Sequence, residues 1–419
     1  MANHHQILII GGGSAGITVA ASLKNHSHDG ELDVAIIEPS ANHYYQPAFT
    51  LVGGGAYSLS KTRRDEASLI PDGVHWIKDA AANIDPDAKK VGLAKGGGVT
   101  YDFLVVCPGL VCNWTGIEGL SENLGSNGVC SNYAPEHVEY TWETLKASPG
   151  GGTALFTQPA MPIKCPGAPQ KIAYLAADYL RKGGVLQDSD LHFLPQGPSM
   201  FGVPFFAREL AKIADDYGIQ KHFHHNLTRI DGANKRATFA VVGGDDEGKT
   251  VEMNFDMLHA VPPQGPPEVL KNSAVSNDGG WVDVHQHSMQ STKYPNVFGL
   301  GDACSTPNSK TAAAVRKQAP VVVRNLLALI NGKSVEEGYD GYGSCPLTTA
   351  YGKVLMAEFT YGGKVTPTFP LDPREERRSY WWIKKTGLPM MYWNYMLKGH
   401  EAFPEHNTSY DAPEDALRK

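Results

Sequence analysis

Residues 5–23, HQILIIGGGSAGITVAASL, decide the fold. A short apolar run, residues 7–10, leads into Gly11-x-Gly13-x-x-Gly16 and then into a helix-forming run. The first glycine permits a tight strand-to-helix turn, the second lets the backbone approach a pyrophosphate, and the third lets the helix pack on the strand. Because the helix N-terminus also offers free N–H groups to phosphate, this order predicts a dinucleotide site.

An acidic residue completes the pattern. A second apolar run, residues 32–37, ends at Glu38, about 20 residues after the last glycine. Its carboxylate would accept hydrogen bonds from a ribose diol, and it would repel a 2′-phosphate. The strand, the helix and the acid together separate this segment from an ordinary glycine-rich turn, but they leave open whether the ligand is FAD or NAD.

Size and composition exclude several classes of protein. The chain has 419 residues, enough for two or three domains, with 42% apolar and 19% charged residues. Its net charge of −7 argues against a nucleic-acid partner, which would require a basic face. The six cysteines form no C-x-x-C pair, so we predict neither a disulfide framework nor a zinc ribbon.

The location of the protein can also be predicted. Residues 1–5 are too short and polar for a signal peptide, and no apolar run approaches the roughly 20 residues that a membrane span needs. We therefore expect an intracellular protein, or at most one attached peripherally to a membrane surface, with no signal peptide or transmembrane helix. The expected location is the cytoplasmic face of a bacterial inner membrane.

A second α/β unit is predicted further along the chain. A strand at residues 99–106 ends in Cys107-Pro108-Gly109, a turn typical of the chain leaving the first domain of flavoproteins with two dinucleotide-binding domains. Strands and helices then alternate over residues 153–224. After the strand at 153–158, however, the sequence is PAMPIKCPGAPQK, where a nicotinamide-binding copy would carry its glycines. Proline and Met161 would block the approach of phosphate to the backbone, so we expect no NAD site here.

A later segment supplies the other half of the first site. The strand at residues 297–300 ends in Gly301-Asp302, and Lys310 precedes a predicted helix at residues 311–331. A strand ending in Gly-Asp is the second FAD signature of the glutathione-reductase-like superfamily. Both signatures together predict FAD and an α/β, tandem Rossmann-like flavoprotein. We expect an FAD domain at 1–110 and 285–335, a second Rossmann-like domain at 111–284, and a C-terminal region at 336–419.

The histidines and the C-terminal segment need separate interpretations. His222 and His224, like His285 and His287, could share one face of a strand, but no nearby cysteine or carboxylate completes a ligand set, so no metal is predicted.

From residue 374 onward, cations alternate with tryptophan and tyrosine, a composition that suits a helix at a membrane surface. The alternative is a helix packed on the core or in a dimer interface.

Five segments carry a resemblance to a known family: YYQPAFTLVGGG, MPIKCPGAPQK, MFGVPFFARELAKIADDYGI, KTAAAVRKQAP and GYGSCPLTTAYGKVLMAEFTYGG. Over most of residues 5–400 the chain resembles sulfide:quinone oxidoreductases, in particular the branch with the mitochondrial enzymes. The resemblance implies a redox pair formed by Cys165 and Cys345. Hydrosulfide would open their bridge, Cys345 would carry the persulfide, and Cys165 would attack the flavin C4a atom.

The resemblance also implies partners and site residues. Electrons would pass through FAD to ubiquinone or menaquinone, and sulfide, sulfite, glutathione or a similar thiol would accept the sulfur; a homo-oligomer is an open possibility. Another branch uses a third cysteine, and Cys130 lies about where that residue falls. In this chain Cys130 would be a vestige, a sulfur relay or a site of flavin attachment. The expected FAD contacts are Gly11, Gly13, Ser14, Ala15, Gly16, Glu38, Gln46, Pro108, Gly109, Gly301, Asp302, Lys310 and Thr311. The quinone candidates are Tyr351, Phe359, Tyr361, Tyr392 and Trp393.

Three rival functions remain on sequence grounds. A type II NADH:quinone oxidoreductase would need the missing second glycine fingerprint. The flavoprotein subunit of a flavocytochrome sulfide dehydrogenase would need export. A non-catalytic FAD-bound membrane scaffold would not need either cysteine.

Overall fold

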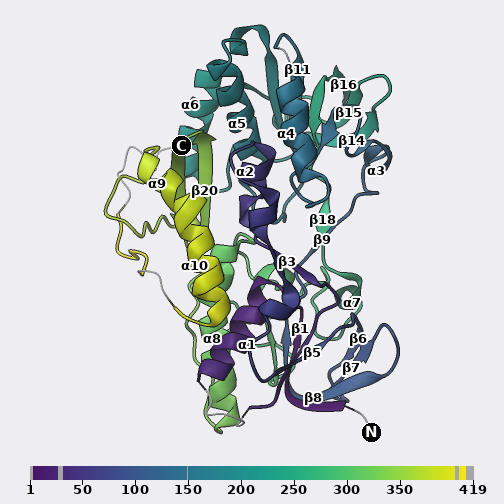
Figure 1. Ribbon diagram of the computed structural model, residues 1–419, viewed down its shortest axis with the longest axis vertical. Helices are drawn as coiled ribbons and strands as arrows, with labels where there is room; N and C mark the ends of the chain where they lie inside the picture. The colour runs from purple at the N-terminus through teal and green to yellow at the C-terminus, as the bar shows by residue number, and fades with distance from the viewer. Residues whose placement is uncertain (1–2, 27–31, 149, 402–404, 412–419) are drawn as a thin grey trace.

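The computed structural model describes residues 3–26, 32–148, 150–401 and 405–411. Figure 1 shows two α/β lobes, one above the other, with a C-terminal segment alongside both. The lower lobe holds the first sheet, in the order β5-β2-β1-β8-β7-β6, with β19 also paired to β8. Its strands are β1 (Asn3–Ile10), β2 (Val34–Ile37), β5 (Val74–Ile77), β6 (Ala81–Asp85), β7 (Lys90–Leu93), β8 (Gly98–Val106) and β19 (Val297–Gly299).

The apolar run after His5 forms the centre of this sheet. Ile7 pairs in parallel with Val34 of β2 on one side and with Phe103 of β8 on the other. Since both neighbours are strands and helices cover the sheet, the run is buried throughout, as its lack of alternation predicts. Helices α1 (Ser14–Asn25) and α8 (Ala312–Ile330) pack against each other beside the sheet. Parallel strands thus bring the two predicted FAD signatures to one edge.

The upper lobe contains a parallel sheet in the order β10-β17-β11-β12-β13 and a flanking three-stranded sheet. Its strands are β10 (Val129–Cys130), β11 (Thr153–Gln158), β12 (Asp190–Pro195), β13 (Gln220–Lys221), β14 (His225–Asp231), β15 (Arg236–Val241), β16 (Thr250–Asn254) and β17 (Met257–His259). Its helices are α3 (Leu120–Asn123), α4 (Val138–Ala147), α5 (Ala168–Lys182) and α6 (Pro204–Tyr217). Strands β9 (Val111–Cys112) and β18 (Gln264–Gly265) pair where the chain crosses between the lobes (Figure 1).

The C-terminal segment joins both lobes. The hairpin of β20 (Gly343–Ala350) and β21 (Lys353–Phe359) packs on α5. It is followed by α9 (Arg378–Trp382), a π-helical turn (Ile383–Gly387) and α10 (Leu388–Asn394). Gly399, beyond α10, lies so close to α1 that a Cβ there would come within 2.4 Å of the Ser22 amide nitrogen. The remaining short elements are α2 (Phe49–Gly53), β3 (Asn42–Tyr44), β4 (Arg63–Asp65) and α7 (Glu268–Lys271).

Most predicted elements are confirmed to within one residue, including β11 and α8. At the end of the predicted alternation of strands and helices, over residues 218–224, only Gln220–Lys221 form a strand. His222 and His224 therefore do not share a strand face; His222 Nε2 instead lies 3.0 Å from His192 Nδ1.

The α/β tandem Rossmann-like class is confirmed, whereas the domain limits stay a prediction. Leu270, Val275 and Val282 pack in the same core as β1, which favours a return to the first lobe earlier than residue 285. Among the described residues, no helix is long and apolar enough to cross a membrane.

Candidate functional site

Each glycine of the fingerprint has a distinct steric role. A Cβ on Gly16 would lie 1.8 Å from the Gly11 carbonyl oxygen, so any side chain there would separate α1 from β1. Gly11 has φ +104°, and its own Cβ would meet the Cys107 carbonyl oxygen at 2.5 Å. Gly13 has nothing within 4 Å of its Cβ position. The open space over Gly13 is therefore available to a ligand.

That space belongs to a cavity of about 280 Å³, which we call the dinucleotide cavity. Twelve of the thirteen predicted FAD contacts line it. They are Gly11, Gly13, Ser14, Ala15, Glu38, Gln46, Pro108, Gly109, Gly301, Asp302, Lys310 and Thr311. The exception is Gly16, which the structure places in the packing of α1 against β1, so its role is to hold the turn together.

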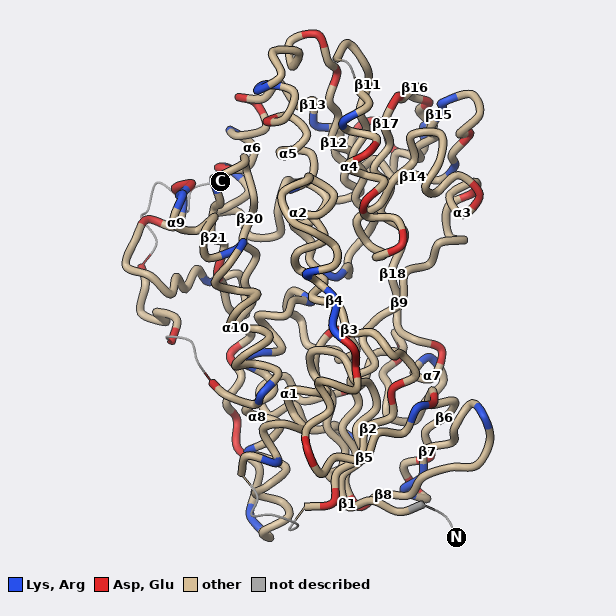
Figure 2. Tube along the Cα trace, viewed as in Figure 1, with Lys and Arg blue, Asp and Glu red and all other residues tan. Residues whose placement is uncertain are grey.

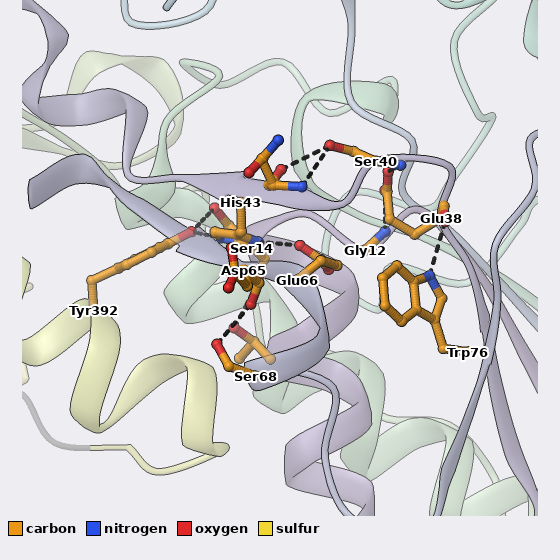
Figure 3. Close-up of polar contacts among 12 residues, drawn as sticks. Gly12, Ser14, Glu38, Ser40, His43, Asp65, Glu66, Ser68, Trp76 and Tyr392 are labelled. Carbon is orange, nitrogen blue, oxygen red and sulfur yellow. Dashed lines mark hydrogen bonds and ion pairs between the residues drawn. The ribbon is translucent and has the colours of Figure 1, made fainter. Parts of the chain in front are cut away.

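Glu38 lies at one end of the dinucleotide cavity. Its Oε2 accepts a hydrogen bond from the Gly12 amide at 2.7 Å, and its Oε1 accepts one from the Ser40 amide at 2.7 Å (Figure 3). Burial nevertheless raises the pKa of the Glu38 carboxyl, and nearby Glu66 adds to this. The carboxylate thus has two anchors and faces the cavity, as a ribose-binding acid should.

The other signature closes the cavity from the opposite side. Lys310 Nζ donates to the backbone oxygens of Asp302, at 2.7 Å, and Cys304, at 3.1 Å. Burial lowers the pKa of Lys310 and raises the pKa of Asp302. The Thr311 hydroxyl caps α8 by accepting from the Ala314 amide, so the positive end of a 19-residue helix points at the cavity.

The residues fit a large polar ligand. Asn132 lines the cavity, and both polar atoms of its side chain are buried without a hydrogen-bond partner in the described part of the chain. The buried hydroxyl of Tyr133, another lining residue, has no partner there either. Buried polar atoms are normally hydrogen-bonded, so these atoms indicate groups that a ligand satisfies. Together with the open face of Gly13, they are consistent with a bound dinucleotide.

The two cysteines singled out by sequence, 180 residues apart, meet beside this cavity. Cys165 lies in the loop between β11 and α5, and Cys345 lies in β20, which packs on α5. Cys165 has φ +51°, a left-handed conformation that is uncommon outside glycine and often marks functional sites. Its amide donates to the Lys310 carbonyl at 2.9 Å, which joins the loop to the second FAD signature.

The pair is electrostatically asymmetric. A hydrogen bond from Cys345, together with the nearby ammonium groups of Lys171 and Lys384, holds the pKa of the Cys165 thiol well below its usual range. The same hydrogen bond, followed by burial, raises the pKa of Cys345. Cys165 is therefore the thiolate of the pair and Cys345 the thiol. Thiolate is the form that reacts in disulfide exchange.

Two buried lysines lie beside the cysteine pair and lower the pKa of Cys165, and the sequence interpretation missed both. Lys171, in the first turn of α5, is 2% exposed, and its Nζ donates to Cys165 Sγ at 3.1 Å. Lys384, in the π-helical turn, is 4% exposed, and burial lowers its pKa to about 7. Lys171 lies on the buried apolar face of its helix, so the helical pattern could have identified it as a buried lysine. The Lys384-Lys385 doublet gave no such indication.

A second cavity of about 110 Å³, which we call the apolar cavity, lies next to the first. Pro47, Cys165, Thr311 and Ala312 line both. The C-terminal segment contributes four apolar residues to its wall: Ile383, Leu388, Met391 and Met396. Lys384 also lines the cavity. An apolar molecule in it would therefore lie against whatever occupies the adjoining end of the dinucleotide cavity.

One of the five predicted quinone residues lines the apolar cavity: Tyr392. Its hydroxyl is 2.7 Å from Ser14 Oγ and 2.6 Å from His43 Nε2 (Figure 3). The others lie elsewhere, because their rings have other partners. Tyr351 donates to the Gly54 carbonyl, Phe359 packs on Phe201, Tyr361 donates to the Gln286 carbonyl, and Trp393 stacks under Arg64. The sequence missed Lys384, Leu388 and Met391 as wall residues.

Cys130 and the histidine groups lie outside both cavities. Cys130 is fully buried in β10, and burial raises the pKa of its thiol to about 12. It is neither ionised at neutral pH nor a lining residue of either cavity. Among the described residues, His5, Asp33 and His75 bring ligand atoms within 4.8 Å of one another, a grouping that the sequence interpretation did not foresee. It lies at the opposite edge of the first sheet from the glycine turn.

The chain is similar to known proteins both in sequence and in fold. Residues 5–138 match the family described as pyridine nucleotide-disulphide oxidoreductase. The chain is 44% identical over 398 residues to the mitochondrial sulfide:quinone oxidoreductase of Dictyostelium discoideum, with 95% of this chain and 87% of that protein covered. It is 40% identical over 402 residues to the mitochondrial sulfide:quinone oxidoreductase of Mus musculus, with 96% and 88% covered. The solved sulfide:quinone oxidoreductase of Aquifex aeolicus has the same fold, with a TM-score of 0.80 at 21% identity over 96% of this chain and 93% of that one.

Proposed function

The chain belongs to the sulfide:quinone oxidoreductase family, and on this premise we propose that it oxidises hydrosulfide at Cys165 and Cys345 and passes two electrons through FAD to a quinone. The observation that carries the proposal is the meeting of the two cysteines, with one of them held as a thiolate, at the wall of the dinucleotide cavity. An NADH oxidoreductase would carry a second glycine fingerprint after β11. This chain has a proline-rich loop there, which does not let the backbone approach the pyrophosphate of a nicotinamide dinucleotide.

FAD, when bound, supplies the two-electron carrier between sulfur and quinone. The residues of this chain hold it at three points. Glu38 would accept hydrogen bonds from the ribose, the amides around Gly13 would bind the pyrophosphate, and the N-terminus of α8 with Lys310 would hold the flavin end. The positive charge and helix dipole there favour negative charge on the ring when it is reduced.

The sulfur step follows from the asymmetry of the cysteine pair. In the oxidised enzyme the two sulfurs are bridged, and hydrosulfide attacks the Cys345 sulfur. An S–S bond forms there while the bridge breaks, and the electron pair of the broken bond leaves on Cys165 as a thiolate. Lys171 and Lys384 stabilise that leaving thiolate. Cys345 keeps the sulfane sulfur, which sulfide, sulfite, glutathione or a similar thiol then removes.

The quinone occupies the apolar cavity in this proposal. Its wall of leucine, isoleucine and methionine suits an isoprenoid quinone, and its shared boundary with the dinucleotide cavity allows direct electron transfer from the flavin ring. Lys384 is the polar group of the C-terminal wall that would face a quinone oxygen, whereas the hydroxyl of Tyr392 is held by Ser14 and His43. This assignment replaces Tyr351, Phe359, Tyr361 and Trp393 with residues of the π-helical turn and α10.

Anaerobic titration of the purified flavoprotein tests the sulfur chemistry. Sulfide should bleach the flavin absorption and NADH should not. Cys165→Ser and Cys345→Ser should abolish bleaching by sulfide while dithionite still reduces the flavin. Cys112→Ser is the matched control, and Cys130→Ser should also leave bleaching intact. Bleaching by NADH, or full quinone reduction by either serine variant of the pair, would overturn the proposal.

Membrane-surface association completes the proposal, because the quinone has to come from a membrane. The C-terminal segment presents Trp382, Met390 and Tyr395 as exposed large apolar side chains within 14 residues. This concentration suits the interface of a bilayer. The bacterial inner membrane stays a prediction, since the relatives named above are mitochondrial.

A further inference from the structure

A wide groove runs between the segment around β4 and the outer face of α10. Its volume is about 760 Å³, and we call it the basic groove. Lys61 and Arg64 line it from the β4 side, and Lys385 lines it from the π-helical turn. Pro389, Met390 and Trp393 of α10 form the apolar part of the same wall. Segments more than 300 residues apart thus build one surface feature.

The groove is cationic on a protein with a net charge of −7. None of the described residues that line it is acidic, and Lys61, Arg64 and Lys385 form no ion pair with another described residue. Figure 2 shows the blue stretch at β4 in the middle of the molecule, directly followed by a red one. Neither carboxylate of the red stretch lines the groove: Asp65 lines a neighbouring pocket that shares Ser58 and Arg64 with the groove, and Glu66 is buried beside His43.

Aromatic and apolar groups accompany these cations. Arg64 lies over the Trp393 ring at 5.0 Å, and Lys385 lies over the Trp381 ring at 5.8 Å. Met390 is 50% exposed at the groove, and Trp382 is 61% exposed one helical turn before the groove residue Thr386. Cations beside protruding tryptophan and methionine match the boundary between phosphate headgroups and acyl chains.

The opposite face of α10 belongs to the apolar cavity. Leu388, Met391 and Tyr392 line that cavity, whereas Pro389, Met390 and Trp393 line the groove. One short helix therefore separates the basic groove from the cavity that we assign to the quinone. A membrane in contact with the groove would lie one helix away from the place where an apolar substrate has to enter.

We propose that the basic groove binds the phosphate headgroup of an anionic phospholipid at a membrane surface, with Lys61, Arg64 and Lys385 around the phosphate and Met390 and Trp382 among the acyl chains. The proposal rests on the proposed function only in that the quinone is drawn from the same membrane. It adds the chemical class of the lipid, the residues that select it and a second segment, around β4, to the membrane contact.

Co-sedimentation of the FAD-loaded full-length protein with vesicles tests the proposal. One set of vesicles contains phosphatidylcholine alone, and the other contains phosphatidylcholine with phosphatidylglycerol. The test variant is Lys61→Gln/Arg64→Gln/Lys385→Gln. The matched control is Lys90→Gln/Lys249→Gln/Lys333→Gln, which removes the same charge from exposed lysines outside the groove. Bleaching of the flavin by sulfide, measured without vesicles, reports on the proposed function separately.

The wild type should bind the anionic vesicles more tightly, and added salt should weaken that binding. Each lost cation should weaken it about fivefold, hence roughly 100-fold for the test variant, while binding to phosphatidylcholine and bleaching by sulfide stay unchanged. Equal losses in the test and control variants would overturn the headgroup site. So would wild-type binding that does not distinguish the two vesicles. Loss of bleaching in the wild type would count against the proposed function and leave the vesicle result standing.

Discussion

At the scale of single residues, the site depends on buried charge that the sequence motifs do not reveal. Lys171 and Lys384 are both almost fully buried, and each faces the sulfur pair. An ammonium group is costly to bury unless an anion compensates it. The Cys165 thiolate is that anion, so the lysines and the thiolate stabilise one another.

Replacing Lys171 tests this mutual stabilisation. Lys171→Gln removes the donor at 3.1 Å from Cys165 Sγ, so the pKa of the Cys165 thiol should rise. Hydrogen bonds to charged groups contribute about 1.5 to 3 kcal/mol, so the flavin should be reduced by sulfide on the order of 10- to 100-fold more slowly at neutral pH. Alkylation of Cys165 against pH should show the shift to higher pH. Lys182→Gln, at the exposed end of the same helix, is the control; an unchanged alkylation profile in Lys171→Gln would contradict the argument.

The buried Lys384 gives a prediction about stability and pH. Its ammonium loses its proton near pH 7 in the folded protein and near pH 10.5 in an unfolded chain. Between these values the folded state binds fewer protons, so this group makes the free energy of unfolding rise with pH. The full cost of burying the charge applies below about pH 7. Lys384→Met should therefore raise the melting temperature by several degrees at pH 6 and by less at pH 9, as measured by differential scanning fluorimetry. Lys385→Met, which replaces the more exposed neighbour, should show no such difference between the two pH values.

At the scale of elements, the glycines in the turn between β1 and α1 have different roles: Gly16 is needed for folding and Gly13 for cofactor binding. Gly16→Ala would force a methyl group to 1.8 Å from the Gly11 carbonyl oxygen and should cost at least about 3 kcal/mol of folding free energy. Gly13→Ala meets no protein atom within 4 Å and should leave the melting temperature of the apoprotein unchanged. Its methyl group would occupy the space of the pyrophosphate, so FAD affinity should fall roughly tenfold or more. Equal melting temperatures for both apoproteins would contradict the distinction.

The Tyr392 hydroxyl of helix α10 connects the C-terminal segment to residues at the dinucleotide cavity by hydrogen bonds. Tyr392→Phe removes the partner of Ser14 Oγ and His43 Nε2, both in the buried network of Figure 3. Leaving buried polar atoms without a partner costs about 1 to 3 kcal/mol, so the variant should melt earlier and release FAD faster on dilution. Tyr395→Phe, whose ring is exposed, should behave as the wild type in both measurements.

At the scale of the whole molecule, sequence predicted what short segments encode. Glycine spacing, Glu38 and the Gly301-Asp302 turn are local patterns with fixed roles in one fold, and all of the residues they identified except Gly16 line one cavity. Cys165 and Cys345 came from resemblance, because residues 180 positions apart show no proximity in a linear sequence.

The wall of the apolar cavity could not be predicted in this way. It is assembled from the π-helical turn, α10 and the β20–β21 hairpin, whose relative placement depends on tertiary packing. Of the aromatic residues predicted for the quinone, Tyr351, Phe359 and Tyr361 do not line this cavity, and their rings or hydroxyls contact other residues. An apolar Leu388 or Met391 carries no local mark of a binding role.

The hydrogen bond from the Cys165 amide to the Lys310 carbonyl links the binding of FAD to the bridging of the two cysteines. Lys310 precedes α8, whose N-terminus points at the dinucleotide cavity, and Cys165 is one of the two cysteines that we propose react with sulfide. If binding of FAD and bridging of Cys165 to Cys345 both favour the conformation in which this bond is made, each favours the other by the same free energy. Saturation with FAD should therefore slow hydrogen exchange at the Cys165 amide, and bridging of Cys165 to Cys345 should in turn tighten the retention of FAD.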